Sequence, residues 1–312
     1  MNKFAKVISS GSYLPERILT NKELENMVDT SDEWITERTG IKERRVASDD
    51  ETSVDMAYEA SIDAIQKSGI DKDEIGAIFL ATCTPERKFP STAVLLQNKL
   101  NIKNAFSVDM NAACTGFIYA LDVAKKYIES NQFKYALVVG TEKITSLLDW
   151  SDRNTCVLFG DGAGAMIIGS SEEAGIMSST IGSDGSYKDL LTVNTDSDYI
   201  EMKGSDVFKT AVNTLGKLAK HTLEINNIEH EQLNWLVPHQ ANERIILAIA
   251  KKINLPKEKI VITVNEHGNT SAASIPLAFD TANNKNIFKK NDYIMLEAFG
   301  AGFTWGSILL KY

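Results

Sequence analysis

Short runs of apolar and β-branched residues alternate along the chain with longer stretches in which apolar positions recur every three or four residues. The first pattern is typical of buried strands and the second of amphipathic helices. The predicted strands cover residues 78–80, 106–108, 136–139 and 165–168 in the first half, and residues 235–237, 260–264, 293–296 and 307–310 in the second. Strands that alternate with helices predict an α/β fold with crossover connections.

The second half repeats the order of the first at a nearly constant offset. Thr82 and His239 each follow a predicted strand and lie 157 residues apart, while Cys114 and Asn269 each open a strand-to-helix turn and lie 155 residues apart. The glycine turns at 159–164 and 299–302 form a third match, since each runs into an apolar strand. Any α/β chain offers chance matches at some offset, but three in the same order favour a duplication.

The repeat predicts two domains. Residues 1–170 would form an N-terminal half that carries Cys114, and residues 171–312 a C-terminal half that carries His239 and Asn269. The polar stretch 183–205 has the weakest pattern, and we expect it to be a surface excursion between the halves.

Composition narrows the class of protein. The 312 residues are 43% hydrophobic and 24% charged, which is typical of a globular protein and excludes disordered, collagen-like and coiled-coil classes. Lys and Arg number 33 against 42 Asp and Glu, a net charge of −9 that is spread over both halves, so we expect no nucleic-acid partner. The first ten residues lack the apolar core of a signal peptide, and no apolar stretch approaches the roughly 18 residues of a membrane span. We therefore expect a cytoplasmic protein without a membrane partner.

Cys114 follows an apolar strand and precedes a helix that is apolar nearly all round. Unpaired N–H groups and the dipole of such a helix favour a thiolate, so we expect a thiol pKa below its usual value of about 8.5 and a nucleophilic sulfur. The alternative is a small buried hydrophobe, which cysteine usage alone favours. Cys83 and Cys156 lack such a turn and take that interpretation; the three thiols lie too far apart for a disulfide scaffold or a metal site.

His239 ends a predicted strand, which is where open α/β sheets place their sites. Taken alone, it is equally well a structural histidine, and Asn269 alone is better explained as a helix cap. The repeat changes this, because a pseudo-twofold axis would bring the two equivalent turns together. We therefore expect Cys114, His239 and Asn269 to converge, whereas His221 and His230 lie in polar sequence and are interpreted as solvated.

Two glycine turns carry separate predictions. Residues 160–164, GDGAG, are followed by a predicted strand, whereas a dinucleotide fingerprint requires a helix there, so a nucleotide site is excluded. We expect these glycines to allow close backbone packing and positive φ near the centre of the molecule. Residues 300–302, GAG, would either offer a backbone N–H to an oxyanion or serve packing alone.

Seven segments stand in a characteristic order: TSDEWI (30–35), RTGI (38–41), AACTGF (112–117), FGDGAGA (159–165), PHQAN (238–242), GNTSAAS (268–274) and FTWG (303–306). Together they resemble the β-ketoacyl-acyl-carrier-protein synthase III family of the thiolase superfamily, over essentially the whole chain. The resemblance implies a thiolase-like α/β fold, in which two duplicated βαβαβαββ halves form a five-layered sandwich, and a homodimer. It implies no cofactor, since acyl-CoA is a substrate.

The resemblance also implies the reaction that starts type II fatty-acid synthesis. An acyl-CoA such as acetyl-CoA acylates Cys114; malonyl-acyl-carrier protein then loses CO₂ and attacks, giving 3-ketoacyl-acyl-carrier protein. His239 and Asn269 would hydrogen-bond the malonyl thioester carbonyl and stabilise the enolate. The backbone N–H groups of Cys114 and Ala301 would form a second oxyanion hole. Family members commonly have glycine where Ala301 stands, and if that position needs positive φ, alanine costs about 1 kcal/mol.

Substrate contacts are implied in the same way. Trp34 and Arg153 would enclose the CoA adenine, Arg38 would meet its phosphates, and Phe89 would close the partner subunit's acyl pocket. Thr30, Gly204 and Asn242 would line the same channel. The acidic carrier protein would dock on Arg244, Lys251 and Lys252, which share one helix face at i, i+7 and i+8, with Lys209 beside them. Without the resemblance, Trp34 and Arg153 are equally well explained by surface packing and an ion pair. The alternative for the four cations is an ordinary solvated helix face.

Other functions are weighed against this one. Thiolases need a second cysteine in the last glycine loop, and elongating synthases a histidine in place of Asn269; this chain has neither. A related acyltransferase or ketosynthase of secondary metabolism, of polyketide or quinolone type, shares the Cys/His/Asn set and is the enzyme alternative. A cysteine hydrolase would release free acid, and a non-catalytic carrier-binding module would not need every reactive position filled.

Overall fold

The structure is a computed structural model that describes residues 4–194 and 197–312. A five-stranded sheet comprises β1 (Phe4–Tyr13), β4 (Ile75–Ala81), β5 (Phe106–Met110), β6 (Tyr135–Glu142) and β7 (Gly162–Ser171), in the order β1-β7-β6-β4-β5. Strands β4, β5 and β6 are parallel, and β7 is antiparallel to both of its neighbours. The four strands predicted in the first half are therefore confirmed.

A four-stranded sheet comprises β8 (Ile176–Ser183), β11 (Leu233–Pro238), β12 (Tyr293–Gly300) and β13 (Thr304–Lys311), in the order β11-β12-β13-β8. Only the pair β11 and β12 is parallel. Followed from β8, this order repeats the first four strands of the other sheet, so β8, β13, β12 and β11 correspond to β1, β7, β6 and β4. The chain leaves the first sheet at Ser171 and enters the second at Ile176; a division into two domains at residue 170 remains a prediction.

The strand predicted at 260–264 is wrong. Ile260 makes an isolated parallel bridge to Leu236, and the chain then enters the short helix α8 (Val264–His267). The buried side-chain oxygen of Gln240 accepts the backbone N–H groups of Thr263 at 2.8 Å and Val264 at 3.1 Å. Those N–H groups are thus diverted from a strand ladder, because each can serve only one good acceptor.

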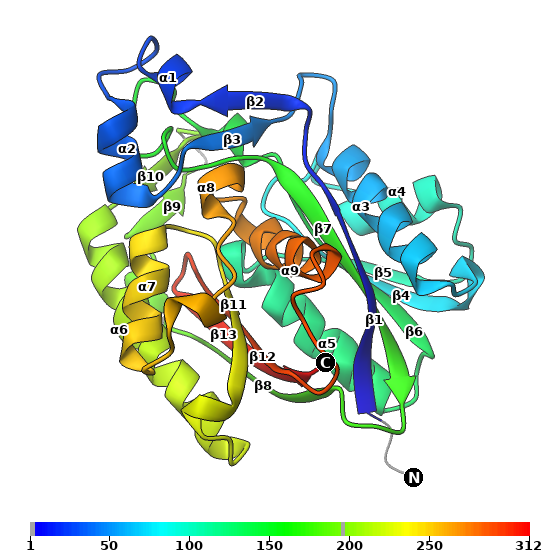
Figure 1. Cartoon of the computed structure of the whole chain (residues 1–312). Coiled ribbons are helices and arrows are strands. Elements are labelled where there is room, and N and C mark those ends of the chain that lie inside the picture. The colour runs from blue at the N-terminus through cyan, green and yellow to red at the C-terminus, as the bar shows by residue number, and fades with distance from the viewer. Residues whose placement is uncertain (1–3, 195–196) are drawn as a thin grey trace.

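Helices cover and separate the two sheets, as Figure 1 shows. Helices α3 (Ser53–Ser68) and α4 (Thr92–Leu100) cover the outer face of the first sheet, and α6 (Gly204–Ile225) and α7 (Glu243–Lys252) that of the second. Helices α5 (Gly116–Glu129) and α9 (Ser274–Asn284) lie between the sheets. These layers make a five-layered α/β sandwich, which confirms the predicted fold class.

The middle layer holds the largest apolar core. Phe117 and Leu121 of α5 and Phe279 of α9 are fully buried against Phe79 of the first sheet and Leu296 of the second. Because α5 and α9 are enclosed on both sides by sheets, nearly every residue in the first two turns of each is buried, whereas α3 buries one face only.

Glycine permits the closest contacts of this layer. A Cβ at Gly164 of β7 would lie 2.7 Å from the backbone N of Leu277 in α9. The predicted close packing of the 160–164 run is therefore confirmed. The predicted positive φ is wrong for its glycines; Gly268 and Gly302 adopt it instead.

Smaller elements surround the cavity described below. Helices α1 (Asn21–Leu24) and α2 (Asp32–Thr39) accompany the ribbon of β2 (Arg17–Thr20) and β3 (Glu43–Val46), and α2 ends at Gly40, whose φ is 76°. The stretch 183–205 contains the hairpin of β9 (Leu191–Val193) and β10 (Ile200–Met202). Since β8 precedes it in the second sheet, this excursion lies within the second half and not between the halves; residues 195–196 fall outside the described part.

Seven short 3₁₀ turns complete the described structure: η1 (Lys72–Glu74), η2 (Ala113–Thr115), η3 (Ile144–Leu147), η4 (Gly185–Tyr187), η5 (His230–Gln232), η6 (Lys257–Lys259) and η7 (Ser271–Ala273). Two of them matter for chemistry, because η2 leads into α5 and η7 into α9. Among the helices of residues 4–194 and 197–312, none has the length and apolar character needed to cross a bilayer.

Candidate active site

Cys114 lies in η2, between the end of β5 and the start of α5. The turn begins at Ala113, whose φ of 46° is unusual for a residue with a side chain. The Asn111 side-chain oxygen accepts the Ala113 N–H at 3.3 Å and holds this conformation. The sulfur is thereby placed just before a buried helix, as the sequence pattern predicts.

The second half contains the same turn. Ser271 opens η7 with a φ of 48°, and the Asn269 side-chain oxygen accepts its N–H at 2.9 Å. Aligned by these turns, Asn269 corresponds to Asn111, and Cys114 corresponds to Ala272. The predicted pairing of Cys114 with Asn269 is therefore wrong by three residues.

Cys114, His239 and Asn269 line one cavity of about 770 Å³. Each is almost fully buried, with 8%, 7% and 6% of its surface exposed. The cavity is also lined by Trp34, Arg38, Gly204, Lys209, Asn242 and Arg244. Residues predicted from segments far apart in the sequence therefore meet in one place.

His239 follows β11 and is held at both its backbone and its ring. Its N–H donates to the Glu297 carbonyl at 2.7 Å, and its Nδ1 lies 2.6 Å from Ser274 Oγ. Because the Gln240 N–H donates to the same Oγ at 3.4 Å, the Ser274 hydroxyl proton is free to point at Nδ1. This arrangement favours the tautomer with the proton on Nε2. Burial lowers the pKa of His239 to about 3, so the ring is neutral near pH 7.

Asn269 is fixed by its backbone. Its N–H donates to the Leu158 carbonyl at 2.8 Å, and its carbonyl accepts the Gly160 N–H at 3.1 Å. Since the side-chain oxygen is occupied by the Ser271 N–H, the amide NH₂ is the group left to donate. Two neutral donors, from Asn269 and His239, therefore belong to one buried site.

The pKa of Cys114 differs from the expectation. Burial raises it to about 12, the Ser271 hydroxyl lowers it in part, and the Glu142 carboxylate raises it further. The predicted fall is wrong, because removing a thiolate from water outweighs the donors at the helix start. Burial also raises the pKa of Cys83, and that of Cys156 to about 11.

Cationic and aromatic side chains gather at the outer end of the cavity. The guanidinium carbons of Arg38 and Arg153 lie 4.9 Å and 5.0 Å from the Trp34 ring centre. Arg153 also donates to the Asp29 carbonyl at 2.8 Å and, unlike Trp34 and Arg38, is not among the lining residues. Thr30 lies outside the lining too, with its hydroxyl buried and without a partner in the described residues.

The turn after β12 packs against Cys114. A Cβ at Gly300 would lie 2.9 Å from the Cys114 backbone N, so glycine is needed for this approach. Ala301 is not among the described residues with positive φ, and the strain considered for alanine does not arise there. Gly302, with a φ of 131°, takes the unusual conformation. Ala301 itself does not line the cavity.

Residues predicted to bind the carrier protein lie on α6 and α7. Lys209 and Arg244 are exposed at the cavity, and the Arg244 guanidinium lies 5.7 Å from the Phe208 ring centre. Lys251 is exposed, and the Lys252 ammonium donates to the Asn213 side chain at 3.1 Å. The four cations therefore follow the junction of the two helices.

Other predicted residues lie away from the cavity. Phe89 is 84% exposed in the loop between β4 and α4. His221 is exposed on α6, and His230 pairs with Glu231. In the described part of the chain, no group of three or more His, Cys, Asp or Glu residues is arranged to hold a metal ion.

Sequence reasoning missed Ser271, Ser274 and Glu142. Ser274 orients the His239 ring, and Ser271 hydrogen-bonds Glu142, a fully buried carboxylate at the end of β6. The only signal for Glu142 in the sequence was its position, as a single acidic residue directly after an apolar strand. The serines lie within the segment 268–274 and carry no signal of their own.

Two family models match parts of this chain. Residues 108–185 match the model for 3-oxoacyl-[acyl-carrier-protein] synthase III, and residues 223–312 match the model for its C-terminal part. A β-ketoacyl-[acyl-carrier-protein] synthase III of Thioalkalivibrio sulfidiphilus is 51% identical, and the match covers 99% of both chains.

Solved structures agree with this. The 3-oxoacyl-[acyl-carrier-protein] synthase III of Aquifex aeolicus is 47% identical, with a TM-score of 0.97 over 99% of this chain and 100% of that one. The priming β-ketosynthase of the R1128 polyketide pathway is 35% identical, with a TM-score of 0.95 over 99% of this chain and 97% of that one. The sequence identity, the share of the chain that it covers and the shared fold together show that this chain belongs to the β-ketoacyl-acyl-carrier-protein synthase III family.

Proposed function

We propose that this protein catalyses the initiating condensation of type II fatty-acid synthesis, from an acyl-CoA and malonyl-acyl-carrier protein. The observation that carries the proposal is the meeting of Cys114, His239 and Asn269 in one cavity that Trp34 and Arg38 also line. A thiol beside two neutral donors suits acyl transfer followed by enolate formation, and the family name describes the same product.

In the first half-reaction, Cys114 attacks the acyl-CoA thioester. The S–C bond to the acyl group forms, the bond to the CoA sulfur breaks, and CoA leaves as a thiol. The backbone N–H groups of Cys114 and Ala301 are proposed to stabilise the negative oxygen of the tetrahedral intermediate. The close contact of Gly300 with the Cys114 turn supports this, because it brings the Ala301 segment near the nucleophile.

In the second half-reaction, malonyl-acyl-carrier protein loses CO₂ and its enolate carbon attacks the acyl-cysteine. The His239 Nε2–H and the Asn269 amide are proposed to donate to the enolate oxygen. Neutral donors in a water-poor site contribute roughly 3 to 4 kcal/mol each to such a transition state. The loss of CO₂ supplies the carbanion, so these steps call for no cofactor.

The two substrates are proposed to share one entrance. Trp34, Arg38 and Arg153 would hold the CoA nucleotide, with Thr30, Gly204 and Asn242 along the channel. Lys209, Arg244, Lys251 and Lys252 would dock the acidic carrier protein. The position of Lys209 and Arg244 at the cavity supports this division, because a carrier docked there can deliver its malonyl arm directly.

Two further expectations belong to the proposal: a cytoplasmic location and a homodimer in which Phe89 closes the partner subunit's acyl pocket. The 84% exposure of this phenylalanine supports a role outside its own chain. The enzyme alternative, a ketosynthase of secondary metabolism, is less favoured, because the polyketide enzyme is 35% identical against 47% and 51% for the fatty-acid synthases.

Intact-mass measurement after incubation with a panel of acyl-CoAs tests the proposal. The wild-type protein should gain the mass of one acyl group, and Cys114→Ala should gain none. Cys83→Ala and Cys156→Ala are the matched controls and should retain the gain. Acylation that persists in Cys114→Ala would refute the nucleophile, and free acid in place of the ketoacyl product would indicate a hydrolase. The acyl-CoA that reacts fastest identifies the primer.

A further inference from the structure

Arg44 of β3 carries a fully buried positive charge that the proposed reaction does not use. Its side chain is 0% exposed and does not line the cavity. In the part of the chain that the structure describes, its guanidinium donates only to neutral oxygens and pairs with no carboxylate. Burial lowers the pKa of Arg44 to about 10, so it remains charged near pH 7. Because burying a cation without a counter-ion lowers stability, stability alone does not explain this arginine.

One arm of the guanidinium is anchored beside α2. Its Nη1 donates to the Leu19 carbonyl at 3.2 Å and to the Asn21 side-chain oxygen at 2.8 Å. The Asn21 NH₂ group in turn donates to Asp32 Oδ1 at 2.8 Å and to the Ile41 carbonyl at 2.7 Å. Asp32 starts α2 and Ile41 lies just beyond its end, so Asn21 is tied to both ends of that helix. The anchor of this arm is therefore itself fixed.

The other arm holds the segment against which Asn269 is fixed. Its Nη2 donates to the Val157 carbonyl at 2.7 Å. The following carbonyl, of Leu158, accepts the Asn269 N–H, and the Gly160 N–H donates back to the Asn269 carbonyl. These two hydrogen bonds form an isolated parallel bridge outside any strand. The bridge has no flanking ladder to keep it in place, and the bond to Val157 supplies that support.

The stem of Arg44 packs against both sides of this bridge. A Cβ at Gly160 or at Gly268 would lie 3.0 Å from the Arg44 Cβ, so the stem touches the backbone of each segment. Gly268 has a φ of 68° and directly precedes Asn269. The stem and the guanidinium thus act together, because one sets the spacing of the two segments and the other sets the direction of the carbonyls.

We infer that Arg44 is a positioning residue for Asn269 in the decarboxylation half-reaction. The inference rests on the proposed function, in which the Asn269 amide donates to the enolate oxygen. Arg44 acts through the Val157 carbonyl and the bridge that follows it. A planar guanidinium serves oxygens of separate segments at once, whereas a lysine ammonium is a point charge on a flexible stem. A displacement of about 1 Å in a donor removes much of its effect on a transition state.

Arg44→Lys tests this, because it keeps the charge and removes the fork. Rapid-quench measurement should show release of CO₂ from malonyl-acyl-carrier protein slowed by about 10-fold, while acylation of Cys114 by saturating acetyl-CoA stays within about twofold. A residue that only stabilises the fold would not separate the two half-reactions. Arg45→Lys is the matched control. Arg45 is the next residue of β3 and its guanidinium donates to the Pro15 carbonyl at 3.1 Å, so both rates should be unchanged.

A double-mutant cycle identifies the residue through which Arg44 acts. If its effect passes through the Asn269 amide, Arg44→Lys should slow CO₂ release by less than about twofold in an Asn269→Ala background. An undiminished effect in that background would overturn the inference, as would equal losses in both half-reactions or a wild-type rate of CO₂ release in Arg44→Lys.

A second variant covers the case in which Arg44→Lys does not fold. Asn21→Ser shortens the side chain that anchors Nη1, and it should give the same selective loss and the same result in the cycle. Losses that remain equal in both half-reactions of Asn21→Ser would again overturn the inference. A wild-type protein that neither acylates Cys114 nor releases CO₂ would refute the proposed function, and the role of Arg44 with it.

Discussion

His239 is 7% exposed, and its Nδ1 lies 2.6 Å from the Ser274 hydroxyl, so the ring is held in one orientation and kept neutral. Asn269 is held by three hydrogen bonds that leave its NH₂ group to donate. Cys114 differs from both, since burial raises its pKa and it must lose a proton to react. At the scale of single residues, the proposed decarboxylation therefore depends on fixed donors, and the proposed acylation on proton removal.

Alanine at His239 or Asn269 should separate the two half-reactions. Because both donors are proposed to hydrogen-bond the enolate, CO₂ release from malonyl-acyl-carrier protein should fall by about 10²-fold or more, while acylation of Cys114 keeps much of its rate. Rapid-quench measurement of each half-reaction checks this. Equal losses in both would mean that His239 acts as the base for Cys114.

The pKa of His239 leads to a pH prediction. A histidine with its usual pKa of about 6.5 would become charged as the pH falls below that value. With a pKa of about 3, His239 stays neutral, so the wild-type rate of CO₂ release should be flat from pH 5.5 to pH 8. A step near pH 6.5 that disappears in His239→Ala would contradict the neutral ring.

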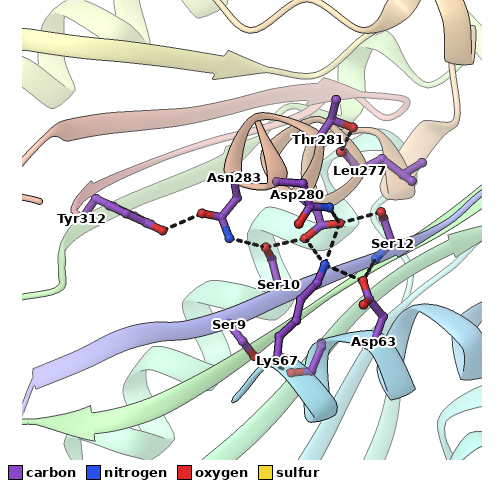
Figure 2. A network of polar contacts seen from close by, with 12 residues as sticks. Ser9, Ser10, Ser12, Asp63, Lys67, Leu277, Asp280, Thr281, Asn283 and Tyr312 are labelled. Carbon is purple, nitrogen blue, oxygen red and sulfur yellow. Dashed lines mark hydrogen bonds and ion pairs between the residues drawn. The ribbon is translucent and has the colours of Figure 1, made fainter. Parts of the chain in front are cut away.

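Helix α9 begins at Ser274, which orients His239, and a buried polar network ties this helix to the first half. The Asp280 carboxylate accepts the hydroxyls of Ser10 and Ser12 of β1, at 2.7 Å and 2.6 Å, and the ammonium of Lys67 of α3 at 3.1 Å (Figure 2). Asp280 is fully buried, and Lys67 also pairs with Asp63 at 2.6 Å. At the scale of elements, this network sets the position of α9 against β1 and α3.

Lys67→Met should destabilise the protein by about 3 kcal/mol, because it leaves the buried Asp280 carboxylate without its cation. The double variant Lys67→Met/Asp280→Asn should recover part of that loss, since no buried charge then remains. Denaturant unfolding checks both. Lys134→Met, which removes an exposed ion pair with Glu74, is the control and should change little. A double variant less stable than Lys67→Met would contradict this account.

The junction of α6 and α7 carries the proposed carrier surface. Charge reversal at Arg244 or Lys251 should raise KM for malonyl-acyl-carrier protein through slower association, and more so at low salt. Acylation by a small acyl-CoA should change little, because that substrate is proposed to bind at Trp34, Arg38 and Arg153. Kinetics with both substrates in about 50 and 300 mM salt decide the matter. Equal damage to both substrates, or no salt dependence, would leave the four cations as ordinary surface.

At the scale of the molecule, two sheets of matching strand order enclose α5 and α9, and the cavity receives residues from both halves. Strand β5 forms an open edge of the first sheet, and Phe106 at its start is 48% exposed. Phe89 lies in the loop that connects β4 to α4 and is more exposed still. An open strand edge with exposed aromatic side chains favours association with a second copy.

Light scattering after size exclusion should therefore give twice the mass of the chain. Phe106→Glu should shift the protein toward monomer, because it places a charge at the edge. Phe89→Ala should remain dimeric but change which acyl-CoA reacts fastest. A wild-type protein that is monomeric at micromolar concentration would contradict both the dimer and the shared acyl pocket.

Much of the fold could be predicted from the order of residues. Seven of the eight predicted strands form, because alternation of short apolar runs with helical periodicity depends on neighbours along the chain. The placement of Cys114 before a buried helix followed from the same local pattern. The resemblance, carried by short motifs, led to the family that the comparisons establish.

The remaining features depend on contacts between residues that are far apart in the sequence, so only the tertiary structure decided them. Gln240 removed the strand predicted at 260–264 by accepting its N–H groups. The matching turns at Ala113 and Ser271 make Ala272, and not Asn269, the counterpart of Cys114. Burial between elements of both halves raised the pKa of Cys114. Folding also placed Glu142 beside Ser271, which lies 129 residues away in the sequence. The sequence by itself determined the elements and the reactive residue types, since local periodicity encodes them. Proton affinities and hydrogen-bond competition were decided only on folding, because they depend on which distant groups share a buried space.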